Sequence, residues 1–350
     1  MVLSKDFWEL PQPEDAYLAK VHDFMRAWKT GQAEFVLHTS GSTGTPKPIH
    51  VFRNQLISSA LATGEALNLG AGTRALVCLN VNYIAGLMML VRGMELNWQL
   101  TVIEPSSNPL LDVDDAAEFD FTALVPLQLA NILENQLTKN RTGSMGKVLL
   151  GGAPVGIRLL NEISGIGIPV FQSYGMTETV SHIALRKLNF PEAEEHYTFL
   201  PGLHFGVDER GCLFVSGAVT RNEIVQTNDL VEINGTTFKW LGRADHVINS
   251  GGVKIVLDQV DAIVAQTFFD LEIANAFFSW YINDEKLGQK LVLLVEGKPL
   301  TIAAHLILDE IRKRSSAYET PKHIYFADEF AKTPTGKVDK RRSFQPFSPS

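Results

Sequence analysis

Residues 35–47 read Phe-Val-Leu-His-Thr-Ser-Gly-Ser-Thr-Gly-Thr-Pro-Lys, an apolar run followed by a loop of glycine, serine and threonine that ends on a lysine. The apolar run predicts a short strand. The loop after it offers close backbone approach, several hydroxyl donors and one positive charge, which together suit a polyphosphate. It is not the Gly-x-x-x-x-Gly-Lys-Ser/Thr phosphate loop, because its glycines lie three apart and Pro46 precedes Lys47. A flexible surface loop is the alternative interpretation.

The segments around this loop alternate between helix and strand patterns. Apolar residues on one helical face predict a helix over residues 14–30, and further helices are expected over 54–67 and 126–137. Short apolar runs predict strands at residues 75–79, 100–103, 122–125, 147–150 and 169–172. Strands that alternate with helices indicate a mostly parallel sheet with helices on its faces.

After about residue 201 the pattern changes to short strands and tight turns. Strands are expected at residues 212–215, 223–226, 230–233 and 237–240, with a hairpin at Asn234-Gly235. Beyond residue 241 follow helices around 260–265 and 303–313 and an extended run at 291–295. The sequence therefore predicts an α/β fold. A large N-terminal domain, residues 1–241, would hold the mostly parallel sheet, its helices and a β-rich portion, and residues 242–350 would form a small mobile α+β domain.

Composition and charge narrow the class of protein. The 350 residues include 31 Lys+Arg and 39 Asp+Glu, a formal net charge of −8, which does not indicate a nucleic-acid partner. The N-terminus lacks the order of a secretory signal, and the longest apolar run, residues 84–91, is far below the roughly 20 residues that span a bilayer. We therefore expect a cytoplasmic protein with no membrane span. Its two cysteines, Cys78 and Cys212, are expected to be buried free thiols.

Five further short motifs follow the glycine-rich loop along the chain. They are Tyr174-Gly175-Met176-Thr177-Glu178, Thr227-Asn228-Asp229, Gly242-Arg243-Ala244-Asp245, Gly251-Gly252-Val253-Lys254 and Pro334-Thr335-Gly336-Lys337. In identity and order the set resembles the adenylate-forming superfamily of acyl-CoA synthetases, peptide-synthetase adenylation domains and luciferases. The resemblance implies that a small carboxylic acid is activated by ATP and Mg²⁺ as an acyl-adenylate and then passed to a thiol, with coenzyme A as co-substrate.

The resemblance gives the matched residues their roles in adenylation. Lys337 would contact the acid and the α-phosphate and stabilise the transition state. Thr177 and Glu178 are the other two catalytic positions that the resemblance implies. Glu178 would also be the metal ligand, for Mg²⁺. Tyr174 would stack on adenine. The other ATP-binding positions implied by the resemblance are Thr39, Ser40, Gly41, Ser42, Thr43, Gly44, Lys47, Gly152, Ala153, Pro154, Ser173, Gly175 and Met176.

The resemblance also implies a moving small domain. Asp229 and Arg243 would hold the ribose hydroxyls of ATP. Asp245 would be the hinge about which the small domain rotates between adenylation and thioester formation. Gly251 and Gly252 would let the pantetheine arm of coenzyme A pass close to the backbone.

Other positions bear on the identity of the acid. Tyr83 stands where related enzymes carry an aromatic or histidine gate. Residues 124–129, Leu-Val-Pro-Leu-Gln-Leu, and the motif from Ser173 onward are similar to those of short o-succinylbenzoate–CoA ligases of menaquinone biosynthesis. Ser181, His182 and Arg186 are expected to offer polar groups to an acid with a second anionic group, although a solvated helix face is the alternative.

Several alternatives remain open from the sequence. Family members place a much longer segment before the phosphate loop, so the resemblance implies that most of the N-terminal subdomain is missing. Another aryl- or acyl-CoA ligase and an enzyme that loads a carrier protein are near alternatives. A non-catalytic nucleotide-binding remnant is a more distant one, and the retention of Lys337 and Glu178 argues against it. The sequence does not indicate the oligomeric state.

Overall fold

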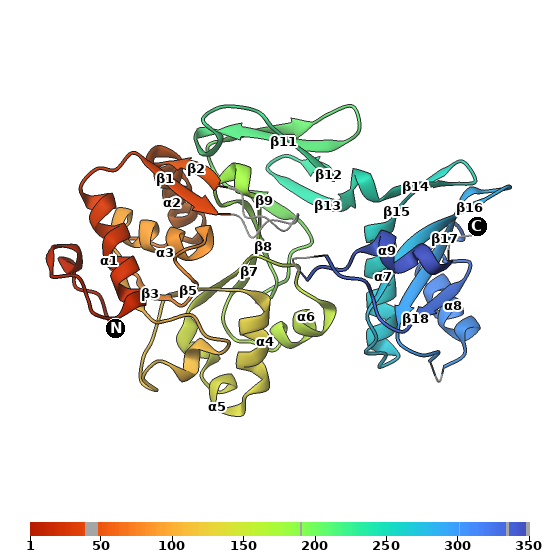
Figure 1. Ribbon diagram of the computed structural model, residues 1–350, viewed down its shortest axis with the longest axis horizontal. Coiled ribbons are helices and arrows are strands. Elements are labelled where there is room, and N and C mark those ends of the chain that lie inside the picture. Colours follow the sequence, from red (N-terminus) through yellow and green to blue (C-terminus); the bar gives the residue numbers. More distant parts are fainter. Residues whose placement is uncertain (39–47, 190, 301, 334–335, 348–350) are drawn as a thin grey trace.

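The computed structural model describes residues 1–38, 48–189, 191–300, 302–333 and 336–347. Its strands form an eleven-stranded sheet, a five-stranded sheet and a two-stranded hairpin (Figure 1). The glycine-rich loop, residues 39–47, and Pro334-Thr335 lie outside the described residues, so what the sequence predicts for them remains a prediction. The hairpin pairs β1 (Glu34–His38) with β2 (Pro48–Phe52) on either side of that loop.

One end of the eleven-stranded sheet is parallel, with the strand order β7-β6-β5-β3-β4. The strands are β3 (Arg74–Val77), β4 (Gln99–Val102), β5 (Phe121–Leu124), β6 (Lys147–Leu150) and β7 (Val170–Gly175). Their residues are largely buried, because helices cover both faces of a parallel sheet. The parallel sheet expected from the sequence is confirmed, with strand ends that differ by up to three residues.

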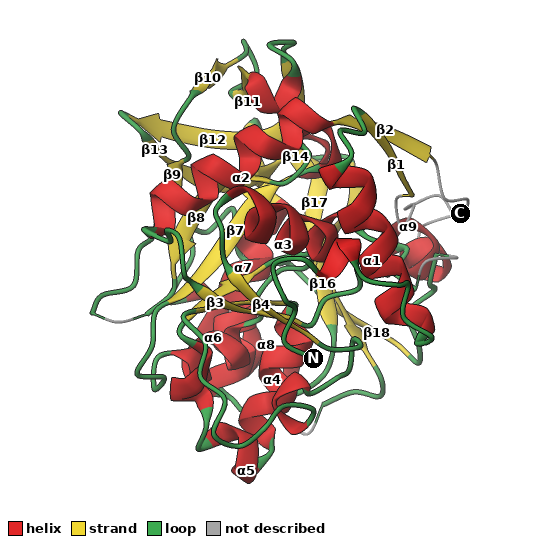
Figure 2. Cartoon of the chain, turned by 90° about the vertical axis from the view of Figure 1, so that its left-hand side faces the viewer, coloured by secondary structure: helices red, strands yellow, loops and turns green. Residues whose placement is uncertain are grey.

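Helices pack on both faces of these parallel strands (Figure 2). The large domain contains α1 (Ala16–Lys29), α2 (Arg53–Leu67), α3 (Ile84–Glu95), α4 (Pro126–Glu134), α5 (Gln136–Lys139) and α6 (Ile157–Ile163). Helices α1 and α3 share a core with one face of the sheet, and α4 and α6 share a core with the other. The single helix expected over 126–137 is two helices, because Asn135 is extended and its side chain caps α5.

The same sheet continues beyond β7 as antiparallel strands. In spatial order these are β8 (His182–Lys187), β9 (Tyr197–Phe199), β13 (Thr237–Arg243), β12 (Val225–Asn234), β11 (Cys212–Gly217) and β10 (Leu203–Val207). The two strands expected at 223–226 and 230–233 are one strand, β12, because β-bulges absorb the polar residues between them. The hairpin is confirmed, since Asn234 pairs with Thr237 and Gly235 has a φ of +59°.

A second sheet organises the C-terminal part of the chain. Its strands are β14 (Val247–Ser250), β15 (Val253–Val256), β16 (Phe277–Asp284), β17 (Gly288–Glu296) and β18 (Ile324–Ala327). Helices α7 (Leu257–Asp270) and α8 (Ala304–Arg312) cover one face, and α9 (Lys340–Phe344) lies on the other. The helices and the extended run expected here are confirmed. Because β13 ends at Arg243 and β14 opens the second sheet, the change of sheet lies beside the domain boundary predicted at 241–242.

Two smaller expectations concern the cysteines and membrane-spanning helices. Cys78 and Cys212 are buried free thiols, as the sequence predicted. Within the described ranges of the chain, every helix is too short or too polar to cross a membrane.

Candidate active site

Several of the expected site residues lie at the carboxyl edge of the parallel strands, where ligands bind in open α/β sheets. The loop after β3 carries Tyr83, the loop after β6 carries Gly152-Ala153-Pro154, and β7 leads into the motif from Tyr174 to Glu178. Two cavities lie along this edge and share lining residues, among them Gly152 and Thr177. The edge is therefore the candidate active site.

A cluster of side chains is centred on Asp229, at the end of the site nearest β12 and β13. The Tyr174 hydroxyl donates to Asp229 Oδ2 at 2.7 Å, and Trp240 Nε1 donates to Oδ1 at 3.2 Å. Arg243 Nη1 lies 3.8 Å from Oδ1. Burial first, and then the Asp229 charge, raises the pKa of Tyr174, so its hydroxyl stays protonated and donates. The fold thus brings together three of the residues expected to bind the nucleotide.

The motif after β7 is held tightly against its neighbours. Ser173 Oγ donates to the main-chain oxygen of Leu150 at 2.8 Å, which ties β7 to the loop that carries Gly152. A Cβ on Gly175 would lie 2.5 Å from the Cα of His182, so only glycine fits this crossing with β8. Met176 follows in an extended conformation and caps the short helix that begins at Thr177.

Glu178 lies on this short helix, η4 (Thr177–Thr179), and is exposed to solvent. Among the residues that the structure describes, no three His, Cys, Asp or Glu side chains form a metal cluster. Magnesium is commonly bound through one or two carboxylates together with substrate phosphates. The exposed Glu178 carboxylate, next in the chain to Thr177 of the cavity lining, fits that arrangement.

The smaller cavity, of about 260 Å³, has a polar end formed by Arg92, Ser181 and His182. Arg92 Nη2 donates to Ser181 Oγ at 3.2 Å, and Ser181 Oγ lies 3.3 Å from His182 Nδ1. His182 Nε2 lies 3.2 Å from Thr63 Oγ1, which itself donates to the main-chain oxygen of Ser59. Because Thr63 uses its proton on Ser59, His182 donates to Thr63 through Nε2, and a neutral His182 then accepts from Ser181 through Nδ1.

Burial keeps His182 neutral in this chain of hydrogen bonds. Burial, and secondarily the charge of Arg92, lowers the pKa of His182 well below its ordinary value. A neutral imidazole leaves Arg92 as the charged group at this end of the cavity. The predicted acid-pocket residues Ser181 and His182 do lie together on a cavity, at the end where polar groups meet.

Arg92 is a candidate functional residue that the sequence analysis missed. It lies on the buried side of α3 with 2% of its surface exposed. Its nitrogens contact only Ser181 Oγ and, at 3.8 Å, Met89 Sδ, and Nε has no partner among the described residues. Burial lowers its pKa to about 10. The signal in the sequence was a charge placed directly after the apolar run 84–91.

The expectation that Arg186 would serve the acid pocket is wrong. The segment that carries it is strand β8 and not a helix. Four residues along a strand separate side chains by about 13 Å, whereas on a helix they would be neighbours. Arg186 instead donates to Gln172 Oε1 at 2.7 Å, and its guanidinium carbon lies 5.1 Å from the centre of the Tyr197 ring, away from Ser181.

Val180 connects the glutamate motif to Ser181 in a strained conformation. Its φ is +65°, which is rare for a β-branched side chain. Val180 lines both cavities, and its side chain is buried. Backbone strain of this kind persists where the surrounding structure enforces it, often at functional sites. Here it turns the chain so that Ser181 faces Arg92.

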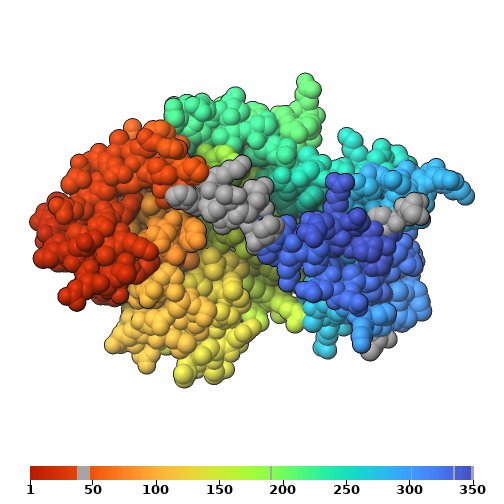
Figure 3. All heavy atoms as spheres, in the orientation of Figure 1, coloured from red at the N-terminus to blue at the C-terminus, as the bar shows by residue number. Residues whose placement is uncertain are grey.

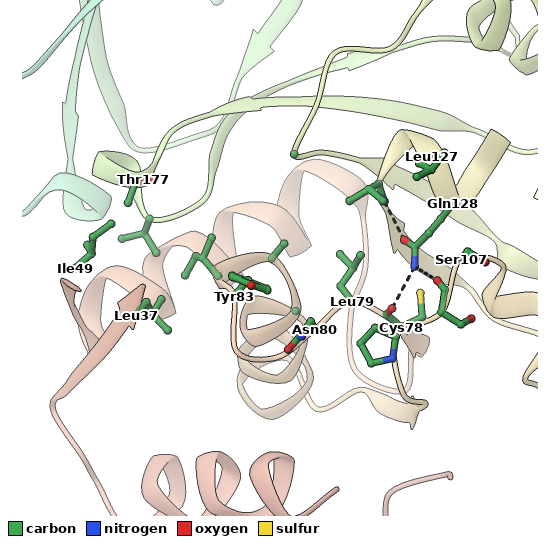
Figure 4. Close-up of a pocket in the computed structure, with 18 of the residues that line it drawn as sticks. Leu37, Ile49, Cys78, Leu79, Asn80, Tyr83, Ser107, Leu127, Gln128 and Thr177 are labelled. Carbon is green, nitrogen blue, oxygen red and sulfur yellow. Dashed lines mark hydrogen bonds between the residues drawn. The ribbon is translucent and has the colours of Figure 1, made fainter. Parts of the chain in front are cut away.

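The larger cavity, of about 580 Å³, is mainly apolar and opens to solvent (Figure 4). Tyr83, the predicted gate, lies on its wall with 51% of its surface exposed. Gln128 donates to the main-chain oxygens of Ser106 and Cys78 at 2.9 and 3.4 Å and accepts from the Val125 N–H at 3.1 Å. These bonds join three loops into one wall, which explains the glutamine in the segment 124–129.

The small domain carries the other predicted site residues. Asp245 lies between β13 and β14, and its Oδ1 is 3.0 Å from Arg243 Nε. Gly251 and Gly252 form the β14–β15 turn with φ values of +61° and +83°, as glycine allows. Lys337 is exposed on the segment before α9, and its N–H donates to Thr333 Oγ1 at 3.2 Å. In Figure 1 this segment reaches from the small domain toward the large one.

Comparisons with known proteins identify the family to which the chain belongs. Residues 4–202, more than half of the chain, match the AMP-binding enzyme family. A crystal structure from Dyadobacter fermentans, described as an acyl-CoA synthetase (AMP-forming)/AMP-acid ligase II-like protein, is 60% identical, and the match covers 99% of each chain with a TM-score of 0.71. The chain belongs to the AMP-binding enzyme family, among its AMP-forming acyl- and aryl-CoA ligases.

More distant relatives carry more specific names. A 2-succinylbenzoate–CoA ligase of Lactococcus lactis is 23% identical over 87% of this chain and 69% of its own length. The o-succinylbenzoate coenzyme A synthetase of Bacillus subtilis, solved with ATP and magnesium ion, is 23% identical, and the match covers 88% of this chain and 69% of that one with a TM-score of 0.70. At this identity the likeness establishes the shared fold.

Proposed function

We propose that the chain activates an aromatic dicarboxylic acid, with o-succinylbenzoate as the best candidate, and transfers its acyl group to coenzyme A. The observation that carries this proposal is the buried guanidinium of Arg92 at the polar end of the smaller cavity, which has no carboxylate partner among the described residues. A buried charge is costly unless an opposite charge compensates it. The second carboxylate of the acid would supply that charge.

The linings of the two neighbouring cavities also support an aryl dicarboxylate. The apolar larger cavity suits an aromatic ring, and Ser181 beside Arg92 offers a hydroxyl to the distal carboxylate. A simple fatty acid or a benzoate would leave Arg92 unpaired. The names of the Lactococcus lactis and Bacillus subtilis relatives agree with this choice of acid.

In the proposed mechanism, Asp229 and Arg243 orient the ribose of ATP, and Tyr174 holds the Asp229 carboxylate in place. Glu178 would hold Mg²⁺, which neutralises phosphate charge when it is bound. Lys337 would bring its ammonium to the reacting carboxylate and the α-phosphate, where negative charge increases in the transition state. The acid carboxylate attacks the α-phosphorus and pyrophosphate leaves.

The second step would use coenzyme A. Its thiol attacks the acyl carbon, and AMP leaves with the bond electrons. Rotation at Asp245 would bring Gly251 and Gly252 toward the carboxyl edge, where the pantetheine arm could pass over a backbone without side chains. Each of these residue roles is part of the proposal.

An acid panel tests the proposed function. Pyrophosphate release with ATP and Mg²⁺ is measured for o-succinylbenzoate, benzoate and decanoate, each with and without coenzyme A. We expect kcat/KM for o-succinylbenzoate to exceed the other two by about 100-fold, the value of one buried charge pair. Ser181→Ala should raise KM for this acid more than KM for ATP. Better turnover of decanoate would exclude the dicarboxylate while leaving the ligase class in place.

A further inference from the structure

One carboxylate connects the two sides of the predicted hinge. Asp258 is the second residue of α7, the first helix of the small domain. Its Oδ2 accepts the N–H of Arg243 at 2.8 Å, and its two oxygens lie 3.0 and 3.1 Å from His246 Nδ1. Arg243 precedes Asp245 in the chain and ends a strand of the large sheet, whereas His246 and Asp258 follow it.

Gly242 makes a second close contact at the same place. Its φ is +142°, and a Cβ built there would lie 2.5 Å from Val256 Cγ1 and 2.8 Å from Asp258 Oδ2. The end of β13 therefore touches the start of α7 with no room for a side chain between them. A rotation of the chain at Asp245 would move these atoms apart.

The Asp258 carboxylate is suited to hold this contact. Burial alone would raise its pKa, but the bonds from His246 and from the Arg243 N–H outweigh burial and lower it, so it stays charged. Arg243 is meanwhile held by two other carboxylates, Asp245 through Nε and Asp229 through Nη1. Arg243, which is expected to bind ribose, is thus also joined to the small domain, because its main-chain N–H bonds Asp258.

We propose that Asp258 is a positioning residue that holds the small domain in the orientation of this structure by binding the main chain ahead of the hinge. The inference rests on the proposed two-step ligase function. In this orientation the segment with Lys337 reaches toward the large domain, whereas the β14–β15 turn with Gly251 points away from it (Figure 1). Asp258 therefore favours adenylation, and it releases Arg243 when the domain rotates for thioester formation.

In Figure 3 the small domain, in teal and blue, lies at one end of the molecule beside the large domain. The contact between the Arg243 N–H and Asp258 is a hydrogen bond to a charged acceptor, which is stronger than a neutral one. Its loss should therefore change the balance between orientations of the small domain.

Half-reaction kinetics test this role. Asp258→Ala should slow acid-dependent ATP–pyrophosphate exchange about tenfold, the value of one charge-assisted hydrogen bond. Thioester formation from supplied acyl-adenylate should be unchanged or faster. Asp258→Asn should fall between, because its amide oxygen can still accept from Arg243. The matched control is Asp309→Asn, which changes an exposed aspartate of α8 paired with Arg312. Equal slowing of both half-reactions would overturn the proposal.

A distance measurement tests the orientation without catalysis. Spin labels at Leu137→Cys and Leu306→Cys would report the separation of the two domains, since these side chains are 72% and 51% exposed. The native thiols, Cys78 and Cys212, are buried and do not compete. We expect a narrow distance distribution that Asp258→Ala broadens or shifts. An unchanged distribution would overturn the role of Asp258, whereas absent exchange in the wild type would count against the ligase function alone.

Discussion

Arg92→Met separates the role of Arg92 in the fold from its role toward the acid. Burial lowers the pKa of Arg92 from the usual value of an arginine to about 10. That lowering corresponds to about 3 kcal/mol. Because the folded-state pKa of this cation is below the unfolded one, the charged form is penalised in the fold at every pH below about 10. The cost decreases as pH rises above about 10.

Methionine keeps an unbranched side chain and removes the charge. At pH 7.5 without the acid, the variant should therefore be more stable than the wild type, with a free energy of unfolding up to about 3 kcal/mol higher. With the acid the order should reverse, because the carboxylate would pair with Arg92 only in the wild type. The loss of a buried charge pair should lower kcat/KM for o-succinylbenzoate about 100-fold and leave benzoate unaffected.

Urea unfolding with and without o-succinylbenzoate, together with steady-state kinetics, measures both effects. Arg186→Met is the matched control, because Arg186 donates to Gln172 and lies outside the cavity lining. A variant less stable than the wild type, combined with equal stabilisation of both proteins by the acid, would refute this account. Arg92 would then serve the fold alone.

Three further changes test other parts of the site. Lys337→Ala should slow acyl-adenylate formation about 10²–10³-fold and spare thioester formation from supplied adenylate, and equal slowing in single-turnover assays would contradict its role. Asp245→Pro should spare adenylation and slow thioester formation, because proline restricts φ at the hinge, so unchanged overall turnover would exclude it. The fold lowers the pKa of His182, so only the unfolded chain gains a proton as pH falls through about 6.5. Between pH 7.5 and 5.5 the free energy of unfolding of the wild type should therefore fall by about 1 kcal/mol more than that of His182→Gln, as measured by urea unfolding.

Local patterns in the sequence predicted most of the elements. The helical face over residues 14–30 corresponds to α1, and the apolar runs after it correspond to β3, β5 and β6. These predictions hold because a helix packed on a sheet carries apolar residues along one face, and a strand covered on both sides is a short continuous apolar run. The order of the motifs likewise indicated the family, since each motif is a short contiguous segment.

The polar end of the acid cavity was decided by tertiary structure. Ser181 and His182 were visible in the sequence, but Arg92 lies about 90 residues earlier and meets them only because the fold brings α3 to the start of β8. Arg186, close in sequence, is carried away by the extended geometry of that strand. The bond between Asp258 and Arg243 could not be predicted from the sequence either, because it depends on how the two sheets lie relative to each other. Periodicity along a chain reports which side of an element is buried, whereas the partners of a buried charge depend on how distant elements pack.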